Sequence, residues 1–135
     1  VDQAKNYIKT VPKEKDSLPP VVDFEYYGKF EKNHPSQETV DKILKPLLKK
    51  LKDHYGKDPI IYVNSNMYKK YISGKYKNRI WLADLKAPKK LPDGRSWEFL
   101  QYSFNSKLTK YAGGIPHLDL NVFRGSRFSF AAKYL

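Results

Sequence analysis

A long amphipathic segment between two β-branched segments is the feature that most restricts the fold of this chain. Residues 21–25 and 59–64 are rich in Val and Ile and are bounded by Pro or Gly, which is typical of buried strands. Between them, residues 37–55 place apolar side chains at the spacing of one helix face: Val40, Ile43, Leu44, Leu47, Leu48 and Leu51. A strand, a helix and a strand in this order predict an α/β protein with a parallel sheet or barrel.

The remaining segments extend this pattern. Residues 1–13 have near-helical apolar spacing that ends at Pro12, and residues 66–73 predict a short helix ended by Gly74. Three further strands are expected over residues 79–84, 96–103 and 117–123, followed by a basic tail. The predicted order is helix-β-α-β-α-β-β-β, in a single domain over residues 1–135. Pro46 should kink or break the long helix.

Charge and composition narrow the classes of partner. The net charge of +12 favours polyanions: nucleic acid, anionic lipid or acidic cell-wall polymer. Lysines are spread over the whole chain without a recognition motif, so nucleic-acid binding stays an alternative and not the first interpretation. Cysteine is absent, and His34, His54 and His117 lack metal-ligand spacing, so we expect no metal and no cofactor. No apolar stretch approaches the ~20 residues that span a bilayer, and the first residues do not read as a signal peptide.

One short motif carries chemistry. Asp23 and Glu25 flank Phe24 at the end of the first predicted strand. Residues i and i+2 of a strand point to the same face, so the two carboxylates would emerge side by side. Two neighbouring carboxylates are the groups that glycosidases use to break a glycosidic bond.

Six segments, taken in order, resemble glycoside hydrolase family 25, the lysozymes or N-acetylmuramidases. The segment Leu18-Pro-Pro-Val-Val-Asp-Phe-Glu25 resembles the catalytic strand of that family. The other five similar segments are residues 4–8, 58–63, 80–83, 97–103 and 114–125. The resemblance implies an irregular (β/α) barrel in which this chain lacks the first three strands. Three explanations stay open: the chain is a fragment of a longer protein, a second copy in a homodimer or a partner segment supplies these strands, or the assembly is rearranged or swapped.

The resemblance also implies a function and a set of site residues. The expected activity is a retaining peptidoglycan hydrolase that cleaves the β-1,4 bond between N-acetylmuramic acid and N-acetylglucosamine. Glu25 would be the general acid, and Asp23 the nucleophile or the stabiliser of a substrate-assisted intermediate. The expected substrate-binding residues are Tyr27, Tyr62, Trp81, Gln101, Tyr102 and Asp119.

Several alternatives stay open at the level of sequence. Asp119 is equally well explained as a salt-bridge partner, and most strand aromatics belong to a core. The chain would be a non-catalytic glycan-binding remnant if the lost strands abolish turnover, and a chitinase-like barrel also uses paired acids. As a muramidase it would be secreted, cell-wall associated or a phage endolysin. Its positive charge would then hold it on anionic wall polymers.

Overall fold

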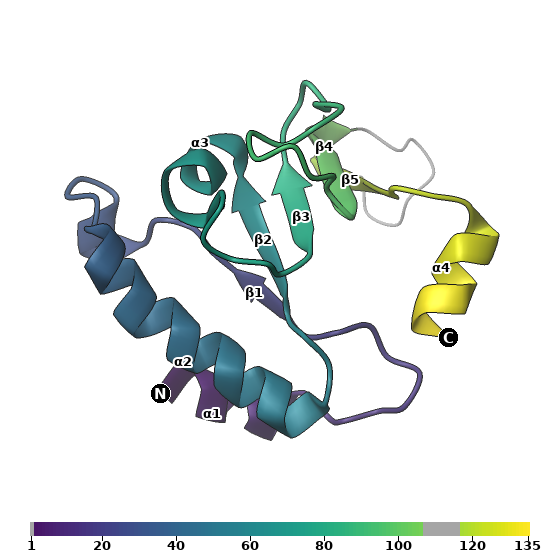
Figure 1. Ribbon diagram of the computed structural model, residues 1–135, viewed down its shortest axis with the longest axis horizontal. Helices are drawn as coiled ribbons and strands as arrows, with labels where there is room; N and C mark the ends of the chain where they lie inside the picture. The colour runs from purple at the N-terminus through teal and green to yellow at the C-terminus, as the bar shows by residue number, and fades with distance from the viewer. Residues whose placement is uncertain (1, 107–116) are drawn as a thin grey trace.

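The computed structural model describes residues 2–106 and 117–135 (Figure 1). The helices are α1 (Asp2–Thr10), η1 (Gly28–Phe30), α2 (Gln37–Tyr55), α3 (Ser65–Met67), the π-helical turn η2 (Tyr68–Ile72) and α4 (Arg127–Tyr134). The strands are β1 (Val21–Asp23), β2 (Ile60–Asn64), β3 (Ile80–Ala83), β4 (Phe99–Ser106) and β5 (Leu118–Phe123). The start of the predicted closing segment, residues 114–116, lies outside the described residues. Within the described ranges, no helix is long and apolar enough to cross a membrane.

The five strands form one sheet in the order β1-β2-β3-β4-β5. The first four are parallel, and β5 runs antiparallel to β4. This confirms the predicted α/β class and the predicted order of strands and helices. The fourth strand begins later than expected, at Phe99, because pairing with β3 starts only at the Trp81–Phe99 register.

The long predicted helix is confirmed at both ends. Ser36 accepts a hydrogen bond from the Thr39 backbone N–H at 3.2 Å, and Gly56 ends α2 in the left-handed conformation with φ +70°. Of the two outcomes expected at Pro46, a kink or a break, the break is excluded, because α2 continues through this residue. Pro46 lies on the exposed side of α2, away from the buried stripe.

Helices α1 and α2 and the turn η2 cover one face of the sheet, which we call the outer face. There α2 and η2 pack on alternate strand residues, including Val22, Ile61, Val63, Leu82 and Leu100. In Figure 1, α1 and α2 run side by side along this face. The opposite, inner face carries the other half of each strand, so it decides where a site can form.

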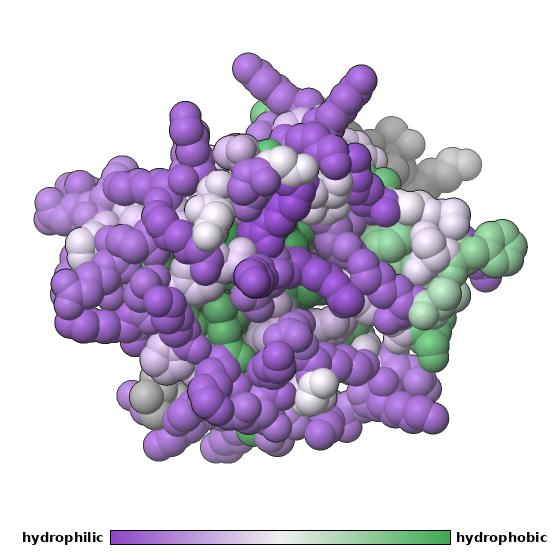
Figure 2. Space-filling model, viewed as in Figure 1, coloured by the Kyte–Doolittle hydropathy of each residue, from purple (hydrophilic) through white to green (hydrophobic). Residues whose placement is uncertain are grey.

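The predicted basic tail is wrong in part, because residues 127–134 form α4. Ser126 begins this helix by accepting a hydrogen bond from the Ser129 backbone N–H at 3.1 Å. Phe130 and Tyr134 then pack against Ile60, Phe99 and Phe123 on the inner face. Figure 2 shows a mainly hydrophilic molecular face with apolar side chains gathered where α4 lies in Figure 1.

Candidate active site

Asp23 and Glu25 lie on the same side of the chain at the carboxyl end of β1. The Phe24 N–H donates to the Tyr62 carbonyl at 2.9 Å, which continues the parallel pairing one residue beyond the strand. The Phe24 ring turns to the outer face, where it meets Tyr71 edge-on at 5.9 Å. The alternation of an extended chain therefore sends both carboxylates to the inner face.

These carboxylates open into a pocket of about 500 Å³ on the inner face. All five strands contribute to it, since every lining residue belongs to a strand or to its immediate extension. The lining residues are Val21, Asp23, Glu25, Tyr62, Trp81, Gln101, Asp119 and Asn121. The structure thus brings together six of the eight residues that the sequence selected.

Two hydrogen bonds fix the side chains at the base of this pocket. The Tyr62 hydroxyl donates to Oε1 of Gln101, which is only 5% exposed. The Trp81 indole N–H donates to Oδ1 of Asn121 at 2.9 Å. The Tyr62 and Trp81 rings meet edge to face at 5.8 Å. Aromatic and amide groups held in this way present a preorganised surface for a polar ring-shaped ligand.

The acids in the pocket influence one another. Partial burial raises the pKa of Asp23, although its carboxylate still reaches solvent. Partial burial also raises the pKa of Glu25, and the negative charge of Asp23 raises it further. The pKa of the Tyr62 hydroxyl is raised by burial and then by Glu25, Asp23 and Asp119. Three carboxylates therefore converge on the space above Tyr62, where an acid that keeps its proton is favoured.

Tyr27 and Tyr102 lie outside this pocket. The strand ends at Asp23, so Tyr27 precedes η1 and is 87% exposed. It lines a second depression, of about 410 Å³, which also includes Asp23 and Glu25. Tyr102 follows Gln101 at an irregularity of β4 and is 43% exposed. The two carboxylates consequently stand between two depressions, with Tyr27 in one and the Tyr62–Trp81 pair in the other.

Sequence reasoning missed Asn121, although a signal for it was available. Asn121 lies two residues after Asp119 on β5 and opposite Gln101 on β4, so alternation puts it on the same face as both. Among the described residues, no group of three or more His, Asp or Glu side chains is arranged to hold a metal ion.

Comparison with known proteins identifies the family. The model of the family described as glycosyl hydrolases family 25 matches residues 1–111. The chain belongs to glycosyl hydrolase family 25.

Solved family 25 structures share the fold described above. A family 25 glycosyl hydrolase from Bacillus anthracis is 38% identical and superposes with a TM-score of 0.89 over 98% of this chain. A lysozyme from Streptomyces coelicolor, 21% identical with a TM-score of 0.73, shows the same fold. The five-stranded sheet is thus an incomplete barrel of the family 25 type.

Both solved and curated relatives are longer than this chain. The chain spans 62% of the Bacillus anthracis protein and 64% of the Streptomyces coelicolor protein. It is also 30% identical to the uncharacterized protein YegX of Escherichia coli K12 over 92% of this chain, and it spans 43% of the length of YegX.

Proposed function

We propose that this chain is the catalytic part of a peptidoglycan hydrolase of the muramidase type. It would cleave the β-1,4 bond between N-acetylmuramic acid and N-acetylglucosamine. The observation that carries the proposal is the pair Asp23 and Glu25, which share one pocket at the carboxyl end of β1. Membership of family 25 and the similarity to lysozyme structures support this substrate class.

Glu25 is proposed as the general acid. A general acid must hold its proton until the leaving oxygen needs it, so its pKa must lie above that of an ordinary glutamate. Partial burial and the charge of Asp23 raise the pKa of Glu25 in that direction. The proton would pass from the Glu25 carboxyl to the glycosidic oxygen as the bond to the sugar breaks.

Asp23 is proposed to act at the anomeric carbon of the sugar while Glu25 protonates the leaving oxygen. Two mechanisms fit its position: direct attack on the anomeric carbon, or stabilisation of an intermediate formed by the 2-acetamido group of the substrate. In both, Glu25 next removes a proton from water, which attacks the anomeric carbon and restores the enzyme with net retention. Both routes need Asp23 in its ionised form.

The other pocket residues are proposed to hold the sugars. Tyr62 and Trp81 offer aromatic faces, while Gln101, Asp119 and Asn121 offer hydrogen-bonding groups to sugar hydroxyls. Tyr27 lines the depression on the other side of the carboxylates. A polysaccharide needs sugar sites on both sides of its scissile bond, and the two depressions that share Asp23 and Glu25 meet this need. An enzyme of this kind would act in the cell wall as a secreted, wall-associated or phage-encoded protein.

The test is release of reducing sugar from purified peptidoglycan by the chain and by Glu25→Gln. We expect release by the chain and a loss of at least about 100-fold in Glu25→Gln, the usual contribution of a positioned proton donor. Glu31→Gln is the matched control, because it changes the glutamate that directly follows η1, and this residue lines neither depression. Release that is equal in Glu25→Gln and Glu31→Gln contradicts the proposal.

A second candidate is a glycan-binding protein without turnover. The observation in its favour is that the Tyr62–Gln101 and Trp81–Asn121 hydrogen bonds hold the pocket side chains in place for a sugar whether or not a reaction follows. It is distinguished by peptidoglycan binding that is retained in Glu25→Gln, without sugar release by either protein. Light scattering on the same sample gives the mass of the species and tests whether a homodimer forms.

A further inference from the structure

A third pocket lies at the end of the sheet opposite the carboxylates. It has a volume of about 730 Å³, within the range of about 300–1,000 Å³ typical of ligand pockets. Its walls are the loop before β1, the end of α2, the residues that precede β2 and β3, and the end of α4. Because β1 to β4 are parallel, these residues lie at the amino ends of the strands and Asp23 lies at the carboxyl end.

Basic side chains dominate this pocket, which we call the basic pocket. It contains six Lys or Arg residues and two aspartates. The basic residues are Lys15, Lys52, Lys57, Lys77, Arg79 and Lys133. Ion pairs occupy two of them, since Lys52 pairs with Asp58 at 2.7 Å and Lys133 pairs with Glu98. The other four are Lys15, Lys57, Lys77 and Arg79, and the remaining aspartate of the lining, Asp16, offsets only part of their charge.

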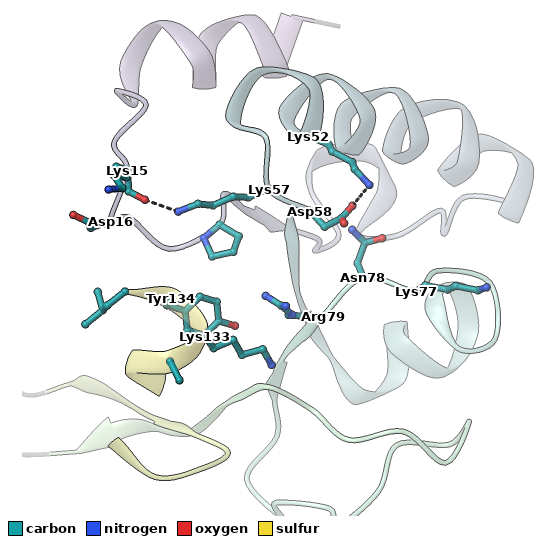
Figure 3. Close-up of a pocket in the computed structure, with 13 residues that line it drawn as sticks. Lys15, Asp16, Lys52, Lys57, Asp58, Lys77, Asn78, Arg79, Lys133 and Tyr134 are labelled. Carbon is teal, nitrogen blue, oxygen red and sulfur yellow. Dashed lines mark hydrogen bonds and ion pairs between the residues drawn. The ribbon is translucent and has the colours of Figure 1, made fainter. Parts of the chain in front are cut away.

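Two of these cations are held in position. The Lys57 ammonium donates to the carbonyls of Lys15 at 2.9 Å and Ser17 at 2.6 Å. An ammonium has three N–H donors, so one remains for a ligand. The Arg79 guanidinium lies 5.5 Å from the ring of Tyr134, which is buried and donates its hydroxyl to Glu98 at 2.7 Å. Figure 3 shows Arg79 in the middle of the basic pocket, between α4 and the segment with Lys57 and Asp58.

We propose that the basic pocket binds a phosphodiester polymer of the bacterial cell wall. The planar guanidinium of Arg79 matches two phosphate oxygens, while the lysines act as point charges along an extended anion. Exposed cations around an open pocket suit a repeating polyanion better than a single small anion, which needs buried polar partners. The proposal rests on the proposed function, since a wall hydrolase meets such polymers next to its substrate.

Nucleic acid fits the basic pocket less well. Sites for single strands combine cations with exposed aromatic rings on which bases stack. The one aromatic residue among the lining side chains is Tyr134, and it is 7% exposed. The pocket therefore offers phosphate recognition without a stacking surface.

The decisive experiment measures binding to purified polyglycerol phosphate in a Glu25→Gln background, so that catalysis plays no part. The test variant is Lys15→Gln with Arg79→Gln, and the control is Lys42→Gln with Lys69→Gln. Both pairs remove two positive charges from exposed residues, but the control residues lie outside the basic pocket. Circular dichroism and melting temperature establish that all proteins are folded.

We expect the test variant to bind about tenfold more weakly at low salt and the control to bind almost as the parent does. The slope of log Kd against log salt should fall by about 1.4 in the test variant, the value for two lost phosphate contacts on a flexible polyanion. Equal weakening in the two variants means that net charge alone attracts the polymer, and it overturns the proposal. Tighter binding of single-stranded DNA of the same charge, lost in the test variant, assigns the pocket to nucleic acid and also overturns it.

This binding experiment and the sugar-release assay together separate this proposal from the proposed function. If polymer binding depends on Arg79 but the unmodified chain releases no sugar, the proposal for the basic pocket stands and the muramidase proposal is rejected. If sugar release depends on Glu25 but polymer binding is no tighter than that of the test variant, the muramidase proposal stands and the proposal for the basic pocket is rejected.

Discussion

The indole N–H of Trp81 donates to Oδ1 of Asn121 at 2.9 Å, which joins β3 to β5 across the inner face of the sheet. β4 lies between these two strands, and its Gln101 accepts from Tyr62 on the other side. The two hydrogen bonds together orient the aromatic and amide groups of the pocket. Their alignment follows from strand register, because Gln101 pairs with Asn121 and Tyr62 pairs with Trp81.

Asn121→Ala should weaken substrate binding more than catalysis. The variant frees the Trp81 indole to rotate, and a typical hydrogen bond contributes about 0.5–1.5 kcal/mol. We expect KM for soluble peptidoglycan fragments to rise about 3- to 10-fold with kcat within about twofold, as for a contact made equally in ground and transition states. Tyr102→Ala is the control, because Tyr102 lies on β4 outside the pocket. A kcat that falls as far as kcat/KM would instead place Asn121 in the chemical step.

The carboxylate pair predicts a measurable shift in the titration of Glu25. Burial raises the pKa of Glu25 above its ordinary value of 4.5, and the charge of Asp23 adds to this. In Asp23→Asn the second cause disappears, so the pKa of Glu25 should fall, although burial keeps it above the ordinary value. NMR titration of the Glu25 carboxyl carbon measures the change. An unchanged pKa would mean that the two carboxylates are too far apart to act as a pair.

The ionised Asp23 carboxylate should lower the free energy of unfolding at neutral pH, whereas a carboxylate in a salt bridge would raise it. The pKa of Asp23 is higher in the folded state than its ordinary value of 3.8, so the folded state binds the proton more tightly than the unfolded state does. The stabilising contribution of Asp23 is thus complete below its ordinary pKa of 3.8, and it is lost as the pH rises through the higher pKa of the folded state. Asp23→Asn should raise the free energy of unfolding at neutral pH by about 0.5 kcal/mol or less, because the group reaches solvent. Urea denaturation at neutral pH and at a pH below 3.8 tests this, since the gain should vanish in acid.

Helix α2 allows a test of how far the sequence pattern predicts packing. Leu51 is fully buried whereas Ile43 is 50% exposed, although both belong to the same predicted apolar stripe. Leu51→Ala should lower the free energy of unfolding by about 2–5 kcal/mol, the range for a large side chain removed from a core. Ile43→Ala should cost about 1 kcal/mol or less, as is usual away from the core. Similar losses in urea denaturation would contradict the difference in burial.

The helices and strands predicted from periodicity were found because each contains a complete local signal. α2 has Ser36 at its start, Gly56 at its end and a continuous stripe between them, so its bounds could be predicted. Ile43 could not be placed in advance, because its exposure depends on what lies next to α2 at the depression lined by Tyr27. The bounds of β4 also depend on partners, since its last residues pair only with β5.

The site residues could be predicted where alternation along one strand decides which face of the sheet a side chain lies on. They were harder to predict where a contact depends on the register between neighbouring strands. Asp23 and Glu25 follow from the i, i+2 rule alone. The contact of Trp81 with Asn121 requires the register between β3, β4 and β5, which is set by tertiary packing. α4 was missed because its apolar residues pack on residues outside the helix. They contact Phe99, which is distant in sequence, and Phe123, which lies on β5 before the turn into α4.

The turn from β5 into α4 has room for glycine alone, and this gives the last prediction. A Cβ at Gly125 would lie 2.5 Å from Oγ of Ser129 and 2.7 Å from the ring of Phe123. Gly125→Ala should therefore lower the free energy of unfolding by about 1–3 kcal/mol, the usual cost of overpacking, as measured by urea denaturation.

The double variant Gly125→Ala with Ser129→Ala removes one of the two clashes, so it should recover part of the loss beyond that of Ser129→Ala alone. The ring of Phe123 cannot retreat without disturbing Phe130 and Tyr134, which it contacts at centroid distances of 5.3 and 6.3 Å. A Gly125→Ala protein as stable as the parent would show that α4 can shift away from the sheet, and that its packing on the inner face is loose.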